Sequence, residues 1–222
     1  MTMVIPSVAG RQALSGAYAA VLSYPHASPV EAARRCADVA RTESEAAAAL
    51  LDAFVSLAEE TPLGTLQEEY TRTFDLDTMS RSQPTCYPYV GHYLFDESHK
   101  RGVFILGLKK RFRASGFEDD SDLADHLVVL LRFLAVCDDE TLALELVDHA
   151  ILPALRRMAI ASGTAEEPVS IRGAYLGVLR ALELSLRAGR AEPASEPAGD
   201  ETEREWLRVG DSLGIDRDWC GH

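Results

Sequence analysis

Apolar positions recur along most of the chain at the three- and four-residue spacing of one helix face. The pattern is clearest where positions repeat at i, i+3, i+4, i+7, i+8 and i+11: Leu123, His126, Leu127, Leu130, Leu131 and Leu134. Val128, Val129 and Phe133 fill the opposite side, so this helix is predicted to be buried almost all round, at the centre of a bundle. Ser121 or Asp122 is expected to cap its first turn.

Other segments with helical periodicity are Ala9–Ser23, Pro29–Arg41, Glu43–Glu60, Gly64–Thr73, Tyr89–Leu94, Glu97–Ser115, Asp139–Ala161 and Val169–Ala188. Pro25 and Gly116 are expected to end the first and sixth of these segments. Pro153 is expected to kink or split the seventh, because it lacks an amide and crowds the carbonyl of His149. No alternating strand pattern and no Asn-Gly hairpin signal is present, so we expect an all-α fold.

The periodic sequence stops near residue 189, which predicts one helical domain over residues 1–189. The segment from Arg190 to Glu205 contains six acidic residues and two arginines, together with prolines and alanines. This composition predicts an acidic flexible linker. Residues 206–222 form a tail whose apolar residues, such as Trp206 and Trp219, could dock a short helix onto the body.

Composition narrows the class of partner. The 222 residues are 47% hydrophobic with a net charge of −13, which argues against nucleic acid and anionic membranes and favours a basic peptide. The four cysteines form no C-x-x-C pair, and neither an export signal nor a run long enough to span a bilayer is present. A reducing cytoplasm is therefore the expected location.

One predicted helix carries both aromatic and acidic side chains. Leu66, Tyr70 and Phe74 share a face at i, i+4 and i+8, and Glu68 and Glu69 lie beside it. Such a surface could bind two arginines and an apolar stretch of peptide through cation–π contacts, carboxylate pairing and apolar burial. An ordinary amphipathic core helix would show the same spacing.

Two further stretches carry candidate binding residues. Residues 75–88 lack periodicity, and their exit crowds Tyr87, Tyr89 and Tyr93 around Pro88, where the rings could either contact a partner or pack a helix junction. Asp125 and His126 stand at the start of the apolar helix, where a carboxylate and an imidazole could hold a guanidinium or respond to pH. His126 also lies on the leucine stripe, as a core-facing histidine would.

The order of these stretches resembles the NarJ/TorD/DmsD family of dedicated chaperones for molybdenum-cofactor oxidoreductases. The resemblance spans roughly Gly64–Met158, and the part around Tyr89–Gly107 is most similar to chaperones of type II DMSO reductases and nitrate reductases. Asp125-His126 matches the end of the family's Glu-x-Pro-Asp-His signature, with Asp122 close to the acidic position and Ala124 where proline is usual. His149 and Pro153 are similar to a second family segment, although Ala154 replaces its bulky aromatic residue.

The resemblance implies a cytoplasmic chaperone with no catalytic activity and no cofactor of its own. Its implied client is the apo catalytic subunit of a molybdopterin-containing oxidoreductase, bound through its twin-arginine signal peptide, and molybdenum-cofactor delivery proteins are further implied partners. Such a chaperone would be a monomer or a domain-swapped dimer. The expected client-peptide-binding residues are Glu69, Tyr70, Phe74, Tyr87, Pro88, Tyr89, Tyr93, Asp122, Asp125 and His126.

Other functions are supported less well. Residues Gly102–Lys109 lack the Gly-Lys-Ser/Thr junction of a phosphate-binding loop, and His92, Asp96 and His99 lack a fourth metal ligand. No hydrolase, metalloprotease or dinucleotide motif is present. A small helical enzyme or ligand-binding bundle with a pocket near Asp125 and His126 is the alternative function, and a scaffold for another folded protein is a third.

Overall fold

The computed structural model describes residues 7–26, 28–74, 86–95, 99–162, 170–188 and 190. Its elements are α1 (Val8–Val21), α2 (Pro29–Arg41), α3 (Glu45–Glu60), α4 (Leu63–Phe74), α5 (Val90–Phe95), α6 (His99–Ala114), α7 (Leu127–Leu134), α8 (Glu140–Leu146), the π-helix η1 (Val147–Ile151), α9 (Leu152–Ala161) and α10 (Ile171–Arg187). These residues contain no strand, only an isolated bridge between Tyr89 and His126. The all-α prediction is confirmed. Residues 75–85, the tail and, apart from Arg190, the predicted acidic linker lie outside the described residues.

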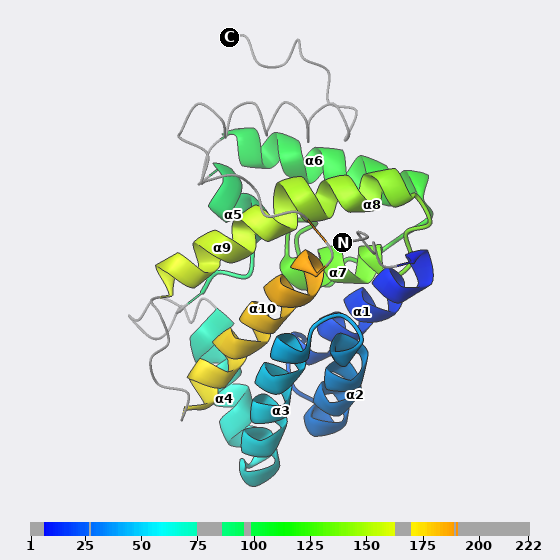
Figure 1. The fold of residues 1–222 in the computed structure, drawn as a ribbon. Coiled ribbons are helices and arrows are strands. Elements are labelled where there is room, and N and C mark those ends of the chain that lie inside the picture. The colour runs from blue at the N-terminus through cyan, green and yellow to red at the C-terminus, as the bar shows by residue number, and fades with distance from the viewer. Residues whose placement is uncertain are drawn as a thin grey trace.

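The helices pack as two groups joined through α7 and α10. In the first group, α2 packs against α1 and α3. In the second, α5 packs against α6 and α9. Figure 1 shows α6 and the α8–α9 rod at one end of the molecule and α2, α3 and α4 at the other. Helix α7 packs on α1 and contacts α6 through the rings of Phe133 and Phe112. Helix α10 contacts α3, α4 and α9, so these two helices hold the groups together.

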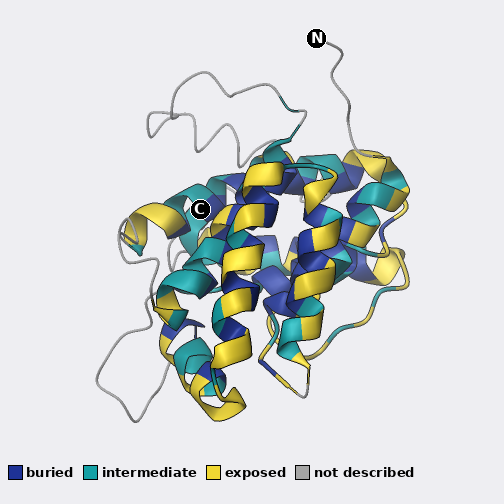
Figure 2. Cartoon of the chain, turned by 60° about the horizontal axis from the view of Figure 1, so that its bottom comes forward, coloured by how far each residue is buried: buried dark blue, intermediate teal, exposed yellow. Residues whose placement is uncertain are grey.

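Helix α7 lies in the core, as its apolar pattern predicts. Seven of its eight side chains are buried, and Arg132 is the exception. Phe133 contacts Phe112 and Phe117, with ring centroids 4.6 and 5.5 Å apart. Figure 2 shows the buried positions on the inward sides of the helices and exposed positions along their outward sides.

The start of α7 differs from the prediction. The helix begins at Leu127 with His126 as its N-cap, so neither Ser121 nor Asp122 caps it, and Leu123 is 44% exposed. The cause is backbone pairing with a distant segment: Val90 N–H donates to the Asp125 carbonyl and Leu127 N–H donates to the Pro88 carbonyl, at 2.8 and 2.7 Å. These bonds hold residues 125 and 126 out of helical geometry.

The predicted breaks elsewhere are confirmed. The segment containing Pro153 is divided into α8, η1 and α9, and the proline stands in the first turn of α9, directly after the π-helix. Because proline has no amide to donate to the preceding turn, the hydrogen-bonding pattern of the helix changes at this place. Helix α6 ends at Ala114, and Gly116 follows with φ of +67°, a conformation that favours glycine.

The thiols of Cys36, Cys86 and Cys137 are buried and unpaired with one another. Burial raises the pKa of Cys36 to about 12, so this thiol stays protonated at neutral pH. Within the described ranges, no helix combines the length and apolar character that crossing a bilayer requires.

Candidate functional site

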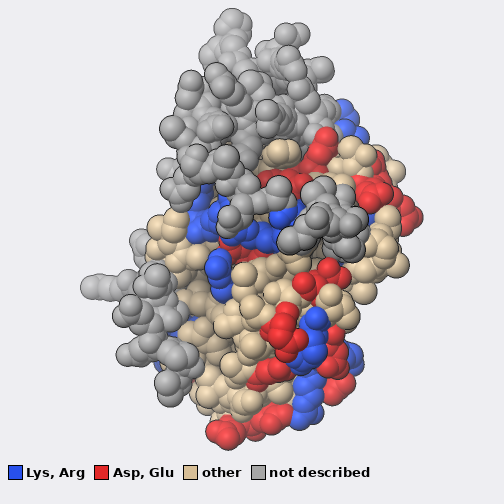
Figure 3. Space-filling model, viewed as in Figure 1, with Lys and Arg blue, Asp and Glu red and all other residues tan. Residues whose placement is uncertain are grey.

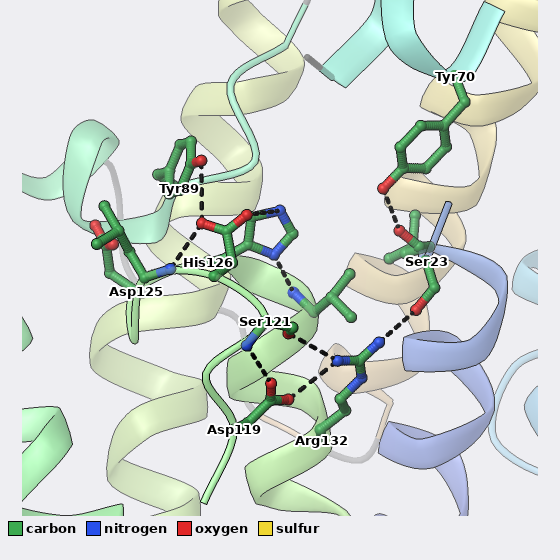
Figure 4. Close-up of polar contacts among 12 residues, drawn as sticks. Ser23, Tyr70, Tyr89, Asp119, Ser121, Asp125, His126 and Arg132 are labelled. Carbon is green, nitrogen blue, oxygen red and sulfur yellow. Dashed lines mark hydrogen bonds and ion pairs between the residues drawn. The ribbon is translucent and has the colours of Figure 1, made fainter. Parts of the chain in front are cut away.

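A groove of about 280 Å³ opens where the end of α1, α4, the segment before α5, the loop before α7 and α7 itself meet. Its lining is formed by Ser23, Tyr24, Tyr70, Phe74, Pro88, Tyr89, Ser121, Asp122, His126, Val128 and Arg132. Figure 4 shows the polar contacts at this place. Segments far apart in the sequence therefore contribute to one surface.

The side of the groove formed by α1 and α4 is aromatic. The Tyr70 hydroxyl donates to the Leu22 carbonyl at 2.9 Å, which fixes the ring against the end of α1. The Tyr24 and Phe74 rings lie 5.5 and 5.0 Å from the Tyr70 ring. A cavity of about 10 Å³ lies beside the groove and shares Tyr70, Phe74, Pro88 and Val128 with it. This side therefore offers apolar and π surface to a ligand.

The opposite side carries Tyr89 and Asp122. The Tyr89 hydroxyl donates to Asp122 Oδ1 at 3.1 Å, and the Arg101 guanidinium lies 5.1 Å from the centre of the Tyr89 ring. Burial, followed by the neighbouring Asp122 charge, raises the pKa of Tyr89 to about 12, so its hydroxyl remains a donor at neutral pH. Asp122 also accepts from the Leu123 amide at 2.7 Å, which fixes the position of the carboxylate.

His126 presents one nitrogen to the helix and the other to Asp122. Its Nδ1 accepts from the Val128 amide at 3.1 Å, so the ring is neutral and its proton is on Nε2, which lies 4.0 Å from Asp122 Oδ2. Burial lowers the pKa of His126 against the opposing effect of Asp122 and Asp125. At neutral pH the groove therefore keeps the Asp122 negative charge without a histidinium beside it.

Arg132 joins three residues at the end of the groove that lies next to α1. It was not among the residues predicted from the sequence. Its Nη1 donates to Asp119 Oδ2 and Ser121 Oγ, and its Nη2 donates to Ser23 Oγ, each at 3.0 Å (Figure 4). Burial acts to raise the pKa of Asp119, but hydrogen bonds with Ser121 and pairing with Arg132 lower it overall. A single charged residue inside the apolar run Leu127–Leu134 was the signal that could have identified Arg132.

Asp125 does not face the groove. Its side chain is fully buried, and Arg101 Nε donates to its Oδ2 at 2.8 Å. A Cβ atom at Gly91 would lie 2.6 Å from the same oxygen, so the absence of a side chain there makes room for the ion pair. Asp125 was predicted to contact the peptide, but the structure places it outside the groove lining, where it holds α6 against the segment that carries Tyr89.

The structure brings six of the ten predicted residues together in the groove lining: Tyr70, Phe74, Pro88, Tyr89, Asp122 and His126. Besides Asp125, three others lie outside it. Glu69 pairs with Arg72 at 2.5 Å, and Tyr87 packs on His92 with ring centroids 4.7 Å apart. The Tyr93 hydroxyl accepts from the Tyr87 amide at 3.1 Å, so this ring fixes the local backbone.

The arrangement is suited to binding. Both serine hydroxyls of the lining accept from Arg132, and His126 contacts neither of them, so the geometry of a base-activated nucleophile is not formed by these residues. Among the described residues, no three His, Cys, Asp or Glu side chains cluster so that they could hold a metal ion. The groove combines aromatic faces, one carboxylate and a neutral imidazole, which together fit a cationic and apolar peptide.

Comparison with known proteins gives the family. Residues 37–158 match the family model described as the nitrate reductase delta subunit. A crystal structure of a protein named as a candidate redox enzyme maturation protein from Archaeoglobus fulgidus has a similar fold, with a TM-score of 0.51 and 20% sequence identity over 78% of this chain and 91% of that one. No curated protein sequence matches the chain. Since the family model covers more than half of its residues, the chain belongs to the nitrate reductase delta subunit family, the family of NarJ/TorD-type chaperones.

Proposed function

We propose that this protein is a cytoplasmic maturation chaperone that binds the apo catalytic subunit of a molybdopterin-containing oxidoreductase through the twin-arginine segment of that subunit. The observation that carries the proposal is the groove, whose lining combines the Asp122 carboxylate with the aromatic rings of Tyr70, Phe74 and Tyr89. Family membership supports the general role of a redox-enzyme maturation chaperone.

The groove residues match the chemistry of such a segment. A guanidinium approaching Asp122 would donate hydrogen bonds to the carboxylate while stacking on the face of Tyr24 or Tyr89. Neighbouring apolar side chains of the peptide would lie on Phe74 and Val128. The positive charge of Arg132 repels a cationic ligand only weakly, because the Asp119 carboxylate accepts a hydrogen bond from Arg132 at 3.0 Å and offsets that charge.

The protein would act by reversible binding, without a chemical step. Selectivity requires that the recognised segment is accessible in the apo client and becomes covered or removed after maturation, because specificity is a difference between two affinities. Binding would therefore delay export or membrane docking until the cofactor has been inserted. The catalytic subunit would be the principal partner, with molybdenum-cofactor delivery proteins joining the complex.

Calorimetry with a twin-arginine peptide tests the proposal. Asp122→Asn should weaken binding about 3- to 10-fold, because it removes a charge-assisted pair from the groove. Asp120→Asn is the matched control: it removes the same charge from an exposed residue outside the groove lining and should leave the affinity unchanged. Equal effects of the two variants, or equal binding of a peptide whose arginines are replaced by alanine, would contradict the proposal.

A further inference from the structure

Helix α6 carries an excess of positive charge in this acidic chain. All three lysines of the sequence, Lys100, Lys109 and Lys110, lie on α6 together with Arg101, Arg111 and Arg113, and the helix contains no acid. The whole chain has a net charge of −13. Helix α6 therefore differs in electrostatic character from the rest of the molecule.

The helix has an inner and an outer face. Phe104, Leu108 and Phe112 recur at i, i+4 and i+8 and are buried against the body. On the other side Leu106 is 64% exposed, and Lys109, Lys110 and Arg113 follow it as exposed residues within two turns. We call these four residues the outer α6 face. It combines an apolar position with three cations, and Figure 1 shows α6 at the edge of the molecule.

The sequence after α10 is complementary to this face. Residues 191–222 contain nine acids and three arginines, a net charge of −6. Within them Trp206, Val209 and Leu213 recur at i, i+3 and i+7, the spacing of one helix face. An acidic segment with an apolar stripe fits a basic face with an exposed leucine, because ion pairing and apolar burial then act together.

The chain leaves α10 within reach of α6. Arg190 is held to Asp148 of η1 by an ion pair of 2.8 Å. Figure 1 shows this end of α10 directed toward the end of the molecule that carries α6 and the α8–α9 rod. The fourteen residues 192–205 span up to roughly 45 Å when extended. This length allows Trp206 to reach any position along the sixteen residues of α6, which measure about 24 Å.

We propose that the outer α6 face is the docking surface for this chain's own segment Glu192–Trp219. The acids of the segment pair with Lys109, Lys110 and Arg113, and its apolar stripe covers Leu106. Helix α6 also carries Arg101, which holds Asp125 and lies over the Tyr89 ring. The docked segment therefore rests on the helix that supports one side of the groove, and it leaves the groove itself open.

Zero-length cross-linking of the full chain tests this assignment directly. A carbodiimide joins lysine amines to carboxylates that touch them, and because every lysine is on α6, each lysine cross-link reports on this helix. We expect peptides that join Lys109 or Lys110 to acids between Glu192 and Asp218, with a yield that falls as salt rises. Absence of such peptides would overturn the proposal.

Two controls make the result specific. Leu106→Ser should lower the yield of these cross-links at least two-fold, whereas Ile160→Ser, at a 68% exposed position on α9, should leave it unchanged. Equal yields in the two variants would overturn the proposal. An equimolar mixture of isotope-labelled and unlabelled chains should give cross-links within single copies, and mixed-isotope products would identify a second copy as the occupant and overturn it.

Discussion

Two aspartates three residues apart have different roles in this structure. Asp125 is fully buried and accepts from Arg101, whereas Asp122 is partly exposed in the groove and accepts from Tyr89. Asp125→Asn should lower the free energy of unfolding by on the order of 3 kcal/mol, because it leaves the Arg101 charge without its buried partner. Asp122→Asn should lower it by less than about 1 kcal/mol. Urea unfolding of both variants measures the difference, and equal losses would contradict the assigned roles.

His126 makes stability depend on pH. The folded protein holds the pKa of His126 below 6.5, chiefly by burial, so the unfolded chain binds the proton more readily. The stabilising contribution is therefore complete above about pH 6.5 and is lost as the pH falls through the folded-state pKa. Urea unfolding between pH 5 and 8 measures this effect. The free energy of unfolding should begin to decline as the pH falls below about 6.5, the pKa of a histidine in the unfolded chain.

His126→Asn is the control for that measurement. Asparagine also caps helices well, so the variant should lose less than about 1 kcal/mol at pH 8. The decline in the free energy of unfolding below pH 6.5 should become smaller, because the titrating group is gone while the other histidines remain. An unchanged pH profile would show that another group is responsible.

At the scale of the helices, local periodicity predicted the elements well, and long-range pairing explains where it failed. The apolar run of α7 was visible in the sequence, but its start was not, because the bonds from Val90 and Leu127 that hold residues 125 and 126 out of the helix join segments about 35 residues apart. Tyr70, Tyr89 and Asp122 could be selected by residue type and by family resemblance. The inward orientation of Asp125 could not, since it depends on Arg101 and on the space above Gly91.

The close packing of α5 against the Asp125–Arg101 pair predicts how alanine substitutions in α5 and α6 change the stability of the fold. In Gly91→Ala the new methyl group would lie 2.6 Å from Asp125 Oδ2 and 3.0 Å from Arg101 Cγ, so the free energy of unfolding should fall by about 1–3 kcal/mol. Gly102→Ala on α6 is the control, because beyond the adjoining residues and backbone of its own helix nothing lies within 4 Å of the added methyl group. It should raise the free energy of unfolding by about 0.5–1 kcal/mol. Thermal or urea unfolding that ranked the two variants in the opposite order would contradict this packing.

Across the whole molecule, charge is distributed unevenly. Acidic side chains are prominent at the end of the molecule formed by α2 and α3, and Lys and Arg gather over α9 and the end of α10 (Figure 3). In the latter region the buried Glu183 carboxylate is surrounded by Arg156, Arg180 and Arg187. These arginines are thus paired within the fold. Because these arginines are partly offset by Glu183, they present less free positive charge to a partner. The net charge of −13 then produces a negative long-range field that attracts a cationic partner.

Such a field should make client-peptide binding depend on salt. Exposed charges are screened beyond about 10 Å at 0.1 M ionic strength, so the affinity for a twin-arginine peptide should fall several-fold when the salt concentration is raised from about 0.05 to about 0.5 M. Calorimetry across this range measures the slope of log Kd against log salt.

Asp122→Asn should reduce the slope, because the groove carboxylate is part of the screened interaction, and Asp120→Asn should change it less. A peptide whose arginines are replaced by alanine should bind weakly at every salt concentration. If the original peptide bound equally well across the range, apolar contacts with Phe74 and Val128 would account for the binding, and the role assigned to Asp122 would be wrong.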